Sequence, residues 1–221
     1  MGKDIPSVDA STKDRSSEKT QQCDFCSEKM LYDNASWKTC AESSDVISKL
    51  LAFGRLRGVV NIVGCKAIDL KQDYIQLAGE LIKRDFLVAT SGCVAVDMEK
   101  AGLMGEGAFK WAGEGLSELC DYLGIAPSFY MGSCKKNLEM QKFYKLLADR
   151  EGVNAGDLPM AVVTLQQHPE QSVIADLHDG TFFYMEKDPV TTIDVIDLHI
   201  HNKRIGLEWC DRYHCSEKTY S

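Results

Sequence analysis

The sequence predicts an α/β fold, with a Rossmann-like parallel sheet of four or five strands flanked by helices in a three-layer α/β/α arrangement. Strand-like and helix-like segments alternate from about residue 44 onward, which is the order expected of a parallel sheet with right-handed crossovers. The strand-like runs are almost wholly apolar, as in V-V-N-I-V at 59–63, and strands covered by helices on both faces show this pattern. A glycine and a cysteine follow three of these runs.

Apolar runs bounded by turn residues predict five strands, and these are residues 59–63, 86–90, 128–131, 158–165 and 181–185. Apolar residues that recur three and four positions apart predict helices between and around them, at residues 45–53, 69–84, 95–101, 109–123, 137–150 and 189–207. Gly54 and Gly124 follow two of these helices as expected of helix ends. Asp188 is a suitable N-cap for the last helix, with Pro189 at its first position.

The composition and net charge argue against several classes of function. The chain has 221 residues, 44% of them hydrophobic and 26% charged, which is ordinary for a globular domain. Its net charge of -8 argues against nonspecific nucleic-acid binding. No apolar run is long enough to span a membrane, and the polar N-terminus lacks a secretory signal. We therefore expect a cytoplasmic protein that binds neither nucleic acid nor membrane.

The chain divides into four parts. Residues 1–22 are rich in Ser, Thr, Lys, Asp and Gln and predict a disordered tail. Residues 23–43 form a short cysteine-bearing segment, residues 44–208 form the α/β domain, and residues 209–221 form a second cysteine-bearing tail.

Three of the nine cysteines share one setting, an apolar strand followed by glycine and the thiol. Cys65 ends V-V-N-I-V-G-C, Cys93 ends F-L-V-A-T-S-G-C and Cys134 ends P-S-F-Y-M-G-S-C. The carboxyl ends of parallel strands lie at one edge of a sheet, where ligands bind. Three thiols there suit an iron–sulfur or other soft-metal centre, because such metals prefer thiolates. The alternative is that they are small buried hydrophobes, as we expect for Cys120. Asp97 is expected on a solvated helix face.

The remaining cysteines lie near the two ends of the chain. A C-x2-C pair is a common chelating half-site, and the tail W-C-D-R-Y-H-C offers further donors. The two ends could form one structural zinc site, bind a cluster at a subunit interface, or be flexible segments with free thiols. The candidate ligands are Cys23, Cys26, Cys40, Cys210, His214 and Cys215.

Several motifs together resemble the C-terminal part of the anaerobic nickel–iron carbon-monoxide dehydrogenases. They are V-V-N-I-V-G-C, E-L-I-K-R-D-F-L-V-A-T-S-G-C, M-E-K-A-G-L and L-G-I-A-P-S-F-Y-M-G-S-C. The resemblance runs from about residue 45 to 151 and resumes in M-E-K-D-P-V and N-K-R-I-G-L; hybrid-cluster proteins share the looser Gly-Cys pattern. It implies that Cys65, Cys93 and Cys134 ligate a nickel-containing [4Fe–4S]-type cluster. The implied reaction oxidises CO with water to CO2 and passes two electrons to an external carrier such as ferredoxin.

The chain departs from this family in three ways. Family members are far longer, and their other cluster ligands, a histidine and further cysteines, precede the matching region. Gln171 stands where the family has a catalytic lysine, and Lys66 and Ala67 replace the asparagines that commonly follow the first Gly-Cys. The missing ligands would come from a partner or a second copy, so we expect a homo-oligomer or a subunit of a larger enzyme.

Two alternatives remain. The chain is either a non-catalytic metal-binding or docking module that kept the fold without the catalytic set, or a metal-free α/β interaction domain with buried cysteines.

Overall fold

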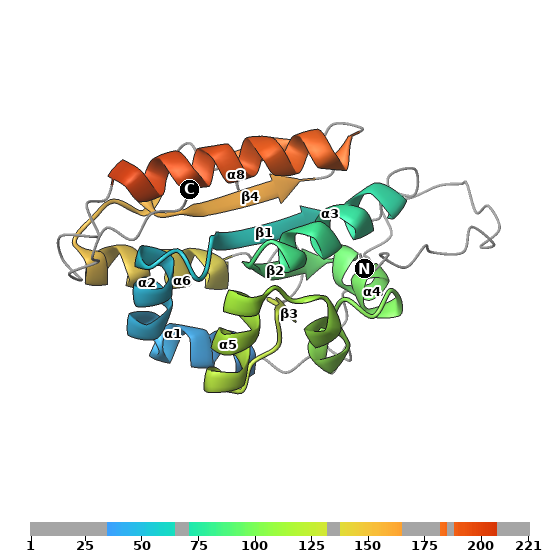
Figure 1. The fold of residues 1–221 in the computed structure, drawn as a ribbon, viewed down its shortest axis with the longest axis horizontal. Coiled ribbons are helices and arrows are strands. Elements are labelled where there is room, and N and C mark those ends of the chain that lie inside the picture. Colours follow the sequence, from blue (N-terminus) through green and yellow to red (C-terminus); the bar gives the residue numbers. More distant parts are fainter. Residues whose placement is uncertain (1–34, 65–70, 132–137, 165–181, 185–187, 207–221) are drawn as a thin grey trace.

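The protein forms a five-stranded sheet in which every neighbouring pair is parallel. A computed structural model describes residues 35–64, 71–131, 138–164, 182–184 and 188–206 (Figure 1). The strand order is β3-β2-β1-β4-β5, the order of the first five strands in a doubly wound nucleotide-binding sheet. This confirms the predicted parallel α/β fold. The strands are β1 (Gly58–Gly64), β2 (Phe86–Gly92), β3 (Ser128–Tyr130), β4 (Met160–Thr164) and β5 (Phe182–Tyr184).

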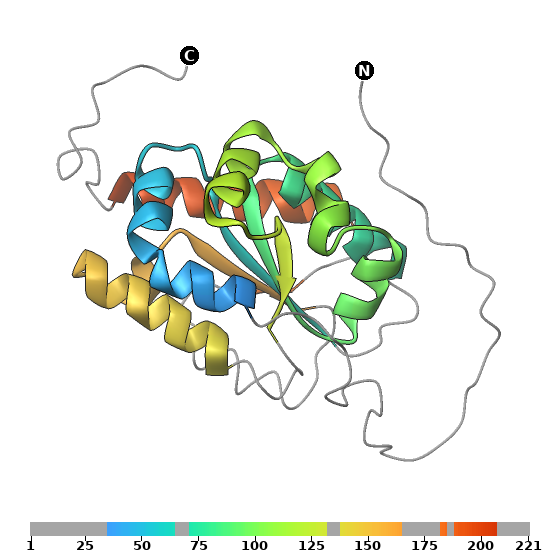
Figure 2. The same ribbon diagram turned by 90° about the horizontal axis from the view of Figure 1, so that it is seen from below.

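Helices cover both faces of the sheet (Figures 1 and 2). The helices α3 and α8 pack against each other on one face, while α1, α2 and α6 contact one another on the other. A short helix, α4, contacts β1, β2 and α3. The α-helices are α1 (Ala35–Glu42), α2 (Ser44–Ala52), α3 (Lys71–Lys83), α4 (Val94–Lys100), α5 (Glu114–Leu123), α6 (Leu138–Glu151) and α8 (Pro189–Gly206), and two 3-10 helices are η3 (Gly105–Trp111) and η5 (Ala155–Asp157).

The two central strands explain the apolar runs in the sequence. All seven residues of β1 and all seven of β2 are buried. They pair in register from Gly58 and Phe86 at one end to Gly64 and Gly92 at the other. The apolar side chains of these strands and of the surrounding helices form one hydrophobic core.

Local signals set the start of α8 as the sequence predicts. The Asp188 carboxylate accepts the backbone N–H groups of Val190, at 3.1 Å, and Thr191, at 3.2 Å. Bonds from the Thr191 hydroxyl and N–H lower the pKa of Asp188. These bonds satisfy N–H groups that have no partner within the helix, which is what an N-cap does.

The predicted helix at 109–123 is wrong in its first third. The chain forms η3 up to Trp111, and α5 begins only at Glu114, after Gly113. The start of α5 at Glu114 depends on Asp85. The Asp85 Oδ1 accepts the Leu116 N–H at 2.9 Å and so caps α5 from a distant part of the chain. A Cβ at Gly113 would lie 2.3 Å from that same oxygen.

The packed body also begins earlier than the predicted boundary at residue 44. Helix α1 was not predicted, yet it contacts α2 and α6, and its Cys40 lies in the hydrophobic core. The predicted tails at 1–22 and 209–221 lie outside the described residues. Within the described part of the chain, no helix is both long and apolar enough to cross a membrane.

Gly115 offers a test of how α5 packs. Its missing side chain lets α5 approach the segment before β1, since a Cβ there would lie 1.8 Å from the Arg55 carbonyl oxygen. We expect Gly115→Ala to lower the free energy of unfolding by about 3 kcal/mol, the upper part of the range for overpacking. Urea denaturation measures this. Ser117→Ala, on the same helix and partly exposed, is the control and should change stability by less than about 0.5 kcal/mol; equal effects would contradict the close approach.

Candidate metal centre

The strands of the first two strand–Gly–Cys motifs end side by side. Gly64 pairs with Gly92, and the Cys93 N–H donates to the Gly64 carbonyl oxygen at 3.2 Å. Cys65 is the residue that follows Gly64 in the chain. Gly92 has φ of 79°, a conformation that favours glycine and turns the chain from β2 into α4. The register therefore brings Gly64 and Gly92, the glycines of the two motifs, to the same level at the carboxyl edge of the sheet.

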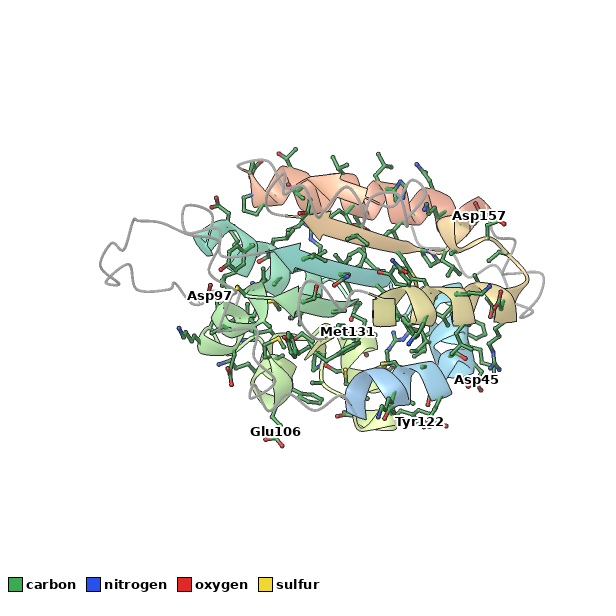
Figure 3. All side chains as sticks on the ribbon, turned by 180° about the vertical axis from the view of Figure 1, so that it is seen from behind. Asp45, Asp97, Glu106, Tyr122, Met131 and Asp157 are labelled. Carbon is green, nitrogen blue, oxygen red and sulfur yellow. The ribbon has the colours of Figure 1, made fainter. Side chains whose placement is uncertain are left out.

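The strand of the third motif, β3, ends at the same edge. Thr90 of β2 pairs with Tyr130 of β3, and the Met131 N–H donates to the Thr90 carbonyl oxygen at 2.9 Å. Figure 3 shows Met131 where β3 ends. Cys134 follows three residues later. Cys65 and Cys134 themselves lie outside the described residues, so the structure places one of the three thiols, that of Cys93, and the three strand ends.

Cys93 lies at the start of α4, with 9% of its surface exposed. Close to it, the Tyr74 hydroxyl of α3 donates to Asp97 Oδ2 of α4 at 2.5 Å. Burial, this bond, the Asp97 charge and that of Cys93 all raise the pKa of Tyr74, in that order of importance. The phenol and the thiol are therefore within electrostatic range of each other.

Sequence reasoning missed this pair. The sequence predicts Asp97 on a solvated face, but Asp97, labelled in Figure 3, is only partly exposed. It accepts a hydrogen bond from the Tyr74 hydroxyl. A signal was present in the spacing, because Asp97 follows Cys93 by four residues and residues four apart lie on one side of a helix.

Two further cysteines lie deep in the core. Cys40 of α1 is 1% exposed and Cys120 of α5 is fully buried, and both are free thiols. Burial raises the pKa of Cys40, with a further contribution from Cys120. Burial also raises the pKa of Cys120 to about 12. Both settings favour the neutral thiol over the thiolate that binds metals, as we predicted for Cys120. Cys40 is therefore packed in the hydrophobic core, whereas the sequence pattern groups it with the terminal metal candidates.

The other terminal candidates are not placed by the structure. Cys23, Cys26, Cys210, His214 and Cys215 all lie outside the described residues. Among the described residues, no three His, Cys, Asp or Glu side chains come together as a metal site would require.

A separate cavity of about 490 Å³ lies beside α8 at the opposite, amino end of the strands. Arg57, which precedes β1, pairs there with Asp197, and Arg84 pairs with Asp194 at 3.0 Å. Ligands of open parallel sheets bind at the carboxyl edge instead, so Cys93 marks the stronger candidate. The residues around the cavity are Gly54, Arg57, Asp194, Asp197, Leu198, Ile200 and His201.

Comparison with known proteins identifies the same family that the Gly–Cys motifs resemble. The model of the Prismane/CO dehydrogenase family matches residues 8–179. The chain belongs to this family. Among curated relatives, the carbon monoxide dehydrogenase of Methanocaldococcus jannaschii is 36% identical over 137 residues, which are 61% of this chain and 21% of the relative. Carbon monoxide dehydrogenase 1 of Methanosarcina acetivorans is 32% identical over 205 residues, covering 77% of this chain and 33% of the relative.

Solved structures of carbon monoxide dehydrogenases share the fold of this chain. A nickel-free carbon monoxide dehydrogenase from Thermococcus sp. AM4 matches with a TM-score of 0.69 and 29% identity, covering 78% of this chain and 33% of that one. Carbon monoxide dehydrogenase IV from Carboxydothermus hydrogenoformans matches with a TM-score of 0.68 and 27% identity, covering 80% and 36%. The chain thus spans about a fifth to a third of the length of these proteins.

The burial of the Cys120 thiol predicts that the stability of the fold depends on pH. An unfolded Cys120 ionises near pH 9, whereas the folded thiol keeps its proton up to about 12. The folded state then binds more protons than the unfolded state, so stability falls as pH rises above about 9. Urea denaturation between pH 8 and pH 10.5 measures this. Cys120→Ala removes the contribution of this thiol and should show a shallower fall than the wild type; identical slopes would contradict the buried neutral thiol.

Proposed function

We propose that this chain holds an iron–sulfur cluster, with nickel, on Cys65, Cys93 and Cys134, and takes part in the oxidation of CO with water to CO2. The observation that carries the proposal is the in-register end of β1 and β2, where the Cys93 N–H bonds to Gly64, the neighbour of Cys65. Membership of the Prismane/CO dehydrogenase family supports the choice of cluster.

Cysteine thiolates at this edge of the sheet would suit an iron–sulfur cluster. Thiolates are the ligands that iron–sulfur clusters and other soft metals prefer. Cys93 is largely shielded from water, which limits oxidation of its thiolate. When bound, the cluster would supply the place where CO and water react and where two electrons are first received. The chain's own residues would hold the thiolates at the sheet edge and exclude bulk water.

The assembly is part of the proposal. A [4Fe–4S] cluster is usually held by four cysteines, and the three strand-end thiols of one chain leave positions to fill. We expect the other ligands to come from a second copy or from another subunit. An electron carrier such as ferredoxin would remove the two electrons, in the reducing cytoplasm of an anaerobic cell. Zinc at the terminal cysteines and His214 stays a prediction.

A second candidate is a non-catalytic module that keeps a cluster or docks on a larger enzyme. Gln171, which stands where the resemblance places the family's catalytic lysine, favours this candidate. This candidate shares the three thiolates with the first and differs in lacking CO oxidation.

The first experiment is to purify the protein without oxygen and measure iron, nickel, zinc and acid-labile sulfide per chain. We expect iron with matching sulfide, and we expect Cys65→Ser, Cys93→Ser and Cys134→Ser each to lose most of both, because each removes a ligand. Cys120→Ser is the control: it changes a thiol in the core, so it should keep the cluster. Single variants that keep the wild-type iron content would contradict the proposed ligands.

The same preparation separates the two candidates. Nickel together with iron justifies an assay of CO oxidation with a viologen dye as electron acceptor. Activity supports the catalytic proposal, whereas a nickel-free cluster without activity supports the module. Zinc without iron or sulfide would point to a structural site at the chain ends instead.

A further inference from the structure

A fully buried asparagine lies in the middle of the central strand. Asn61 belongs to β1, and none of its surface is exposed. Strands that helices cover on both faces are otherwise almost wholly apolar, and burying an amide without a hydrogen bond is costly. Among the described residues, neither Asn61 Oδ1 nor Asn61 Nδ2 has a hydrogen-bond partner. The side chain therefore indicates a site for a small molecule that can hydrogen-bond to it.

Other buried polar side chains of the sheet show the usual solution. The Thr90 hydroxyl of β2 donates to the Ile62 carbonyl oxygen at 3.1 Å. The Ser128 hydroxyl of β3 donates to the Leu103 carbonyl oxygen. Buried polar groups are nearly always satisfied, either by such protein partners or by ordered water. Since Asn61 lacks the first kind of partner among the described residues, we expect the second.

The register shows which face of the sheet Asn61 occupies. A Cβ at Gly58 would lie 2.9 Å from Ile200 Cδ1 of α8, so that position of β1 faces the layer of α3 and α8. Side chains alternate between the two faces along a strand, and β1 pairs with both neighbouring strands without a break. Asn61, three residues after Gly58, therefore faces the opposite layer, which contains α1, α2 and α6 (Figures 1 and 2).

Two buried hydroxyl groups lie diagonally across from Asn61 on this same face. Val63, two residues further along β1, pairs with Ser91 of β2 and with Thr164 of β4. Paired residues of neighbouring strands point to one face, so both hydroxyls share the face of Asn61. Ser91 is fully buried and Thr164 is 1% exposed. A line of polar side chains thus crosses the three central strands just before their carboxyl ends.

The spacing of these groups suits a water molecule. Diagonal neighbours in a sheet have Cβ atoms about 7–8 Å apart. Because the amide and the hydroxyls extend beyond Cβ, two hydrogen bonds joined by one water can span the remaining gap. A hydroxyl donates one hydrogen bond and accepts two, so it can bond to water in addition to a protein group. Directly beside Asn61 in the register lies Ala89, which has no side-chain atom beyond Cβ.

We propose that the polar strip formed by Asn61, Ser91 and Thr164 binds at least one ordered water molecule between the sheet and the layer of α1, α2 and α6. Buried waters typically make about three hydrogen bonds to polar groups, and one amide and two hydroxyls can supply them. The polar strip consists of described residues alone and requires no cluster. The inference is therefore independent of the proposed function, and a chain that takes up no iron would hold the same water.

A high-resolution crystal structure of the full chain is the direct test. We expect electron density for a water within about 3 Å of the Asn61 amide and of at least one hydroxyl of the polar strip. Asn61→Val removes the amide and should remove this water from the density. An amide bonded to a protein group, or one without any water beside it, would overturn the inference. Should Asn61→Val fail to fold, the wild-type density decides by itself.

A double-mutant cycle tests in solution whether the side chains share the water. Thr164→Val removes one hydroxyl with little change of shape, and its effect on the urea midpoint is measured with Asn61 present and in Asn61→Val. We expect the effect to be at least halved in Asn61→Val, because the shared water is already lost and groups in one network are not additive.

Thr192→Val is the matched control for this cycle. Thr192 is 8% exposed, and its hydroxyl donates to the Asp188 carbonyl oxygen at 2.9 Å at the start of α8. Its effect on the urea midpoint should be the same with Asn61 present and in Asn61→Val, since distant sites add. If Thr164→Val proved as additive as Thr192→Val, the shared water of the polar strip would be ruled out.

Discussion

The pairing of β1 with β2 is the constraint on which the rest of the structure depends. Seven residues of each strand pair in register, and all are buried. Since side chains alternate between the faces of a strand, a slip of one residue would turn every apolar side chain to the opposite helical layer. Full burial on both faces makes such a slip costly. The same register places Gly64 opposite Gly92, and hence the ends of the two strands at one level.

The two ends of this strand pair differ in chemistry. At the amino end, Arg57 and Arg84 pair with Asp197 and Asp194 of α8, and these groups are partly exposed. Exposed ion pairs contribute little stability, typically about 0–1 kcal/mol each, so they orient α8 more than they stabilise it. At the carboxyl end, the phenol of Tyr74 and the thiol of Cys93 are largely buried. Interactions are stronger in that drier setting, which is where a cluster would need them.

Much of this fold follows from local pattern, and the failures share one physical cause. The apolar runs predict all five strands, and Asp188 with Pro189 marks the start of α8, because these signals act within a few residues. The break at Gly113 could not be predicted, since it depends on the Asp85 carboxylate, which tertiary structure brings to α5. Helix α1 has little amphipathic pattern of its own and lies against α2 and α6. The candidate site divides in the same way: the Gly–Cys motif singled out Cys93, but the Tyr74–Asp97 bond joins two helices and leaves only a spacing in the sequence.

The cysteines show how position decides the chemistry of a single residue type. Cys40 and Cys120 are enclosed by hydrophobic side chains, and burial holds both as neutral thiols. Cys93 is almost as inaccessible, yet it lies where a strand turns into a helix, with a bonded phenol and carboxylate nearby. Metal binding needs a thiolate, a geometry fixed in advance and other donors within reach. The sheet edge provides a fixed backbone for the first donor and brings two further strand ends beside it, whereas the core around Cys40 and Cys120 offers only packing. Burial alone therefore does not separate the proposed ligand Cys93 from the core cysteines; its place at the end of a strand does.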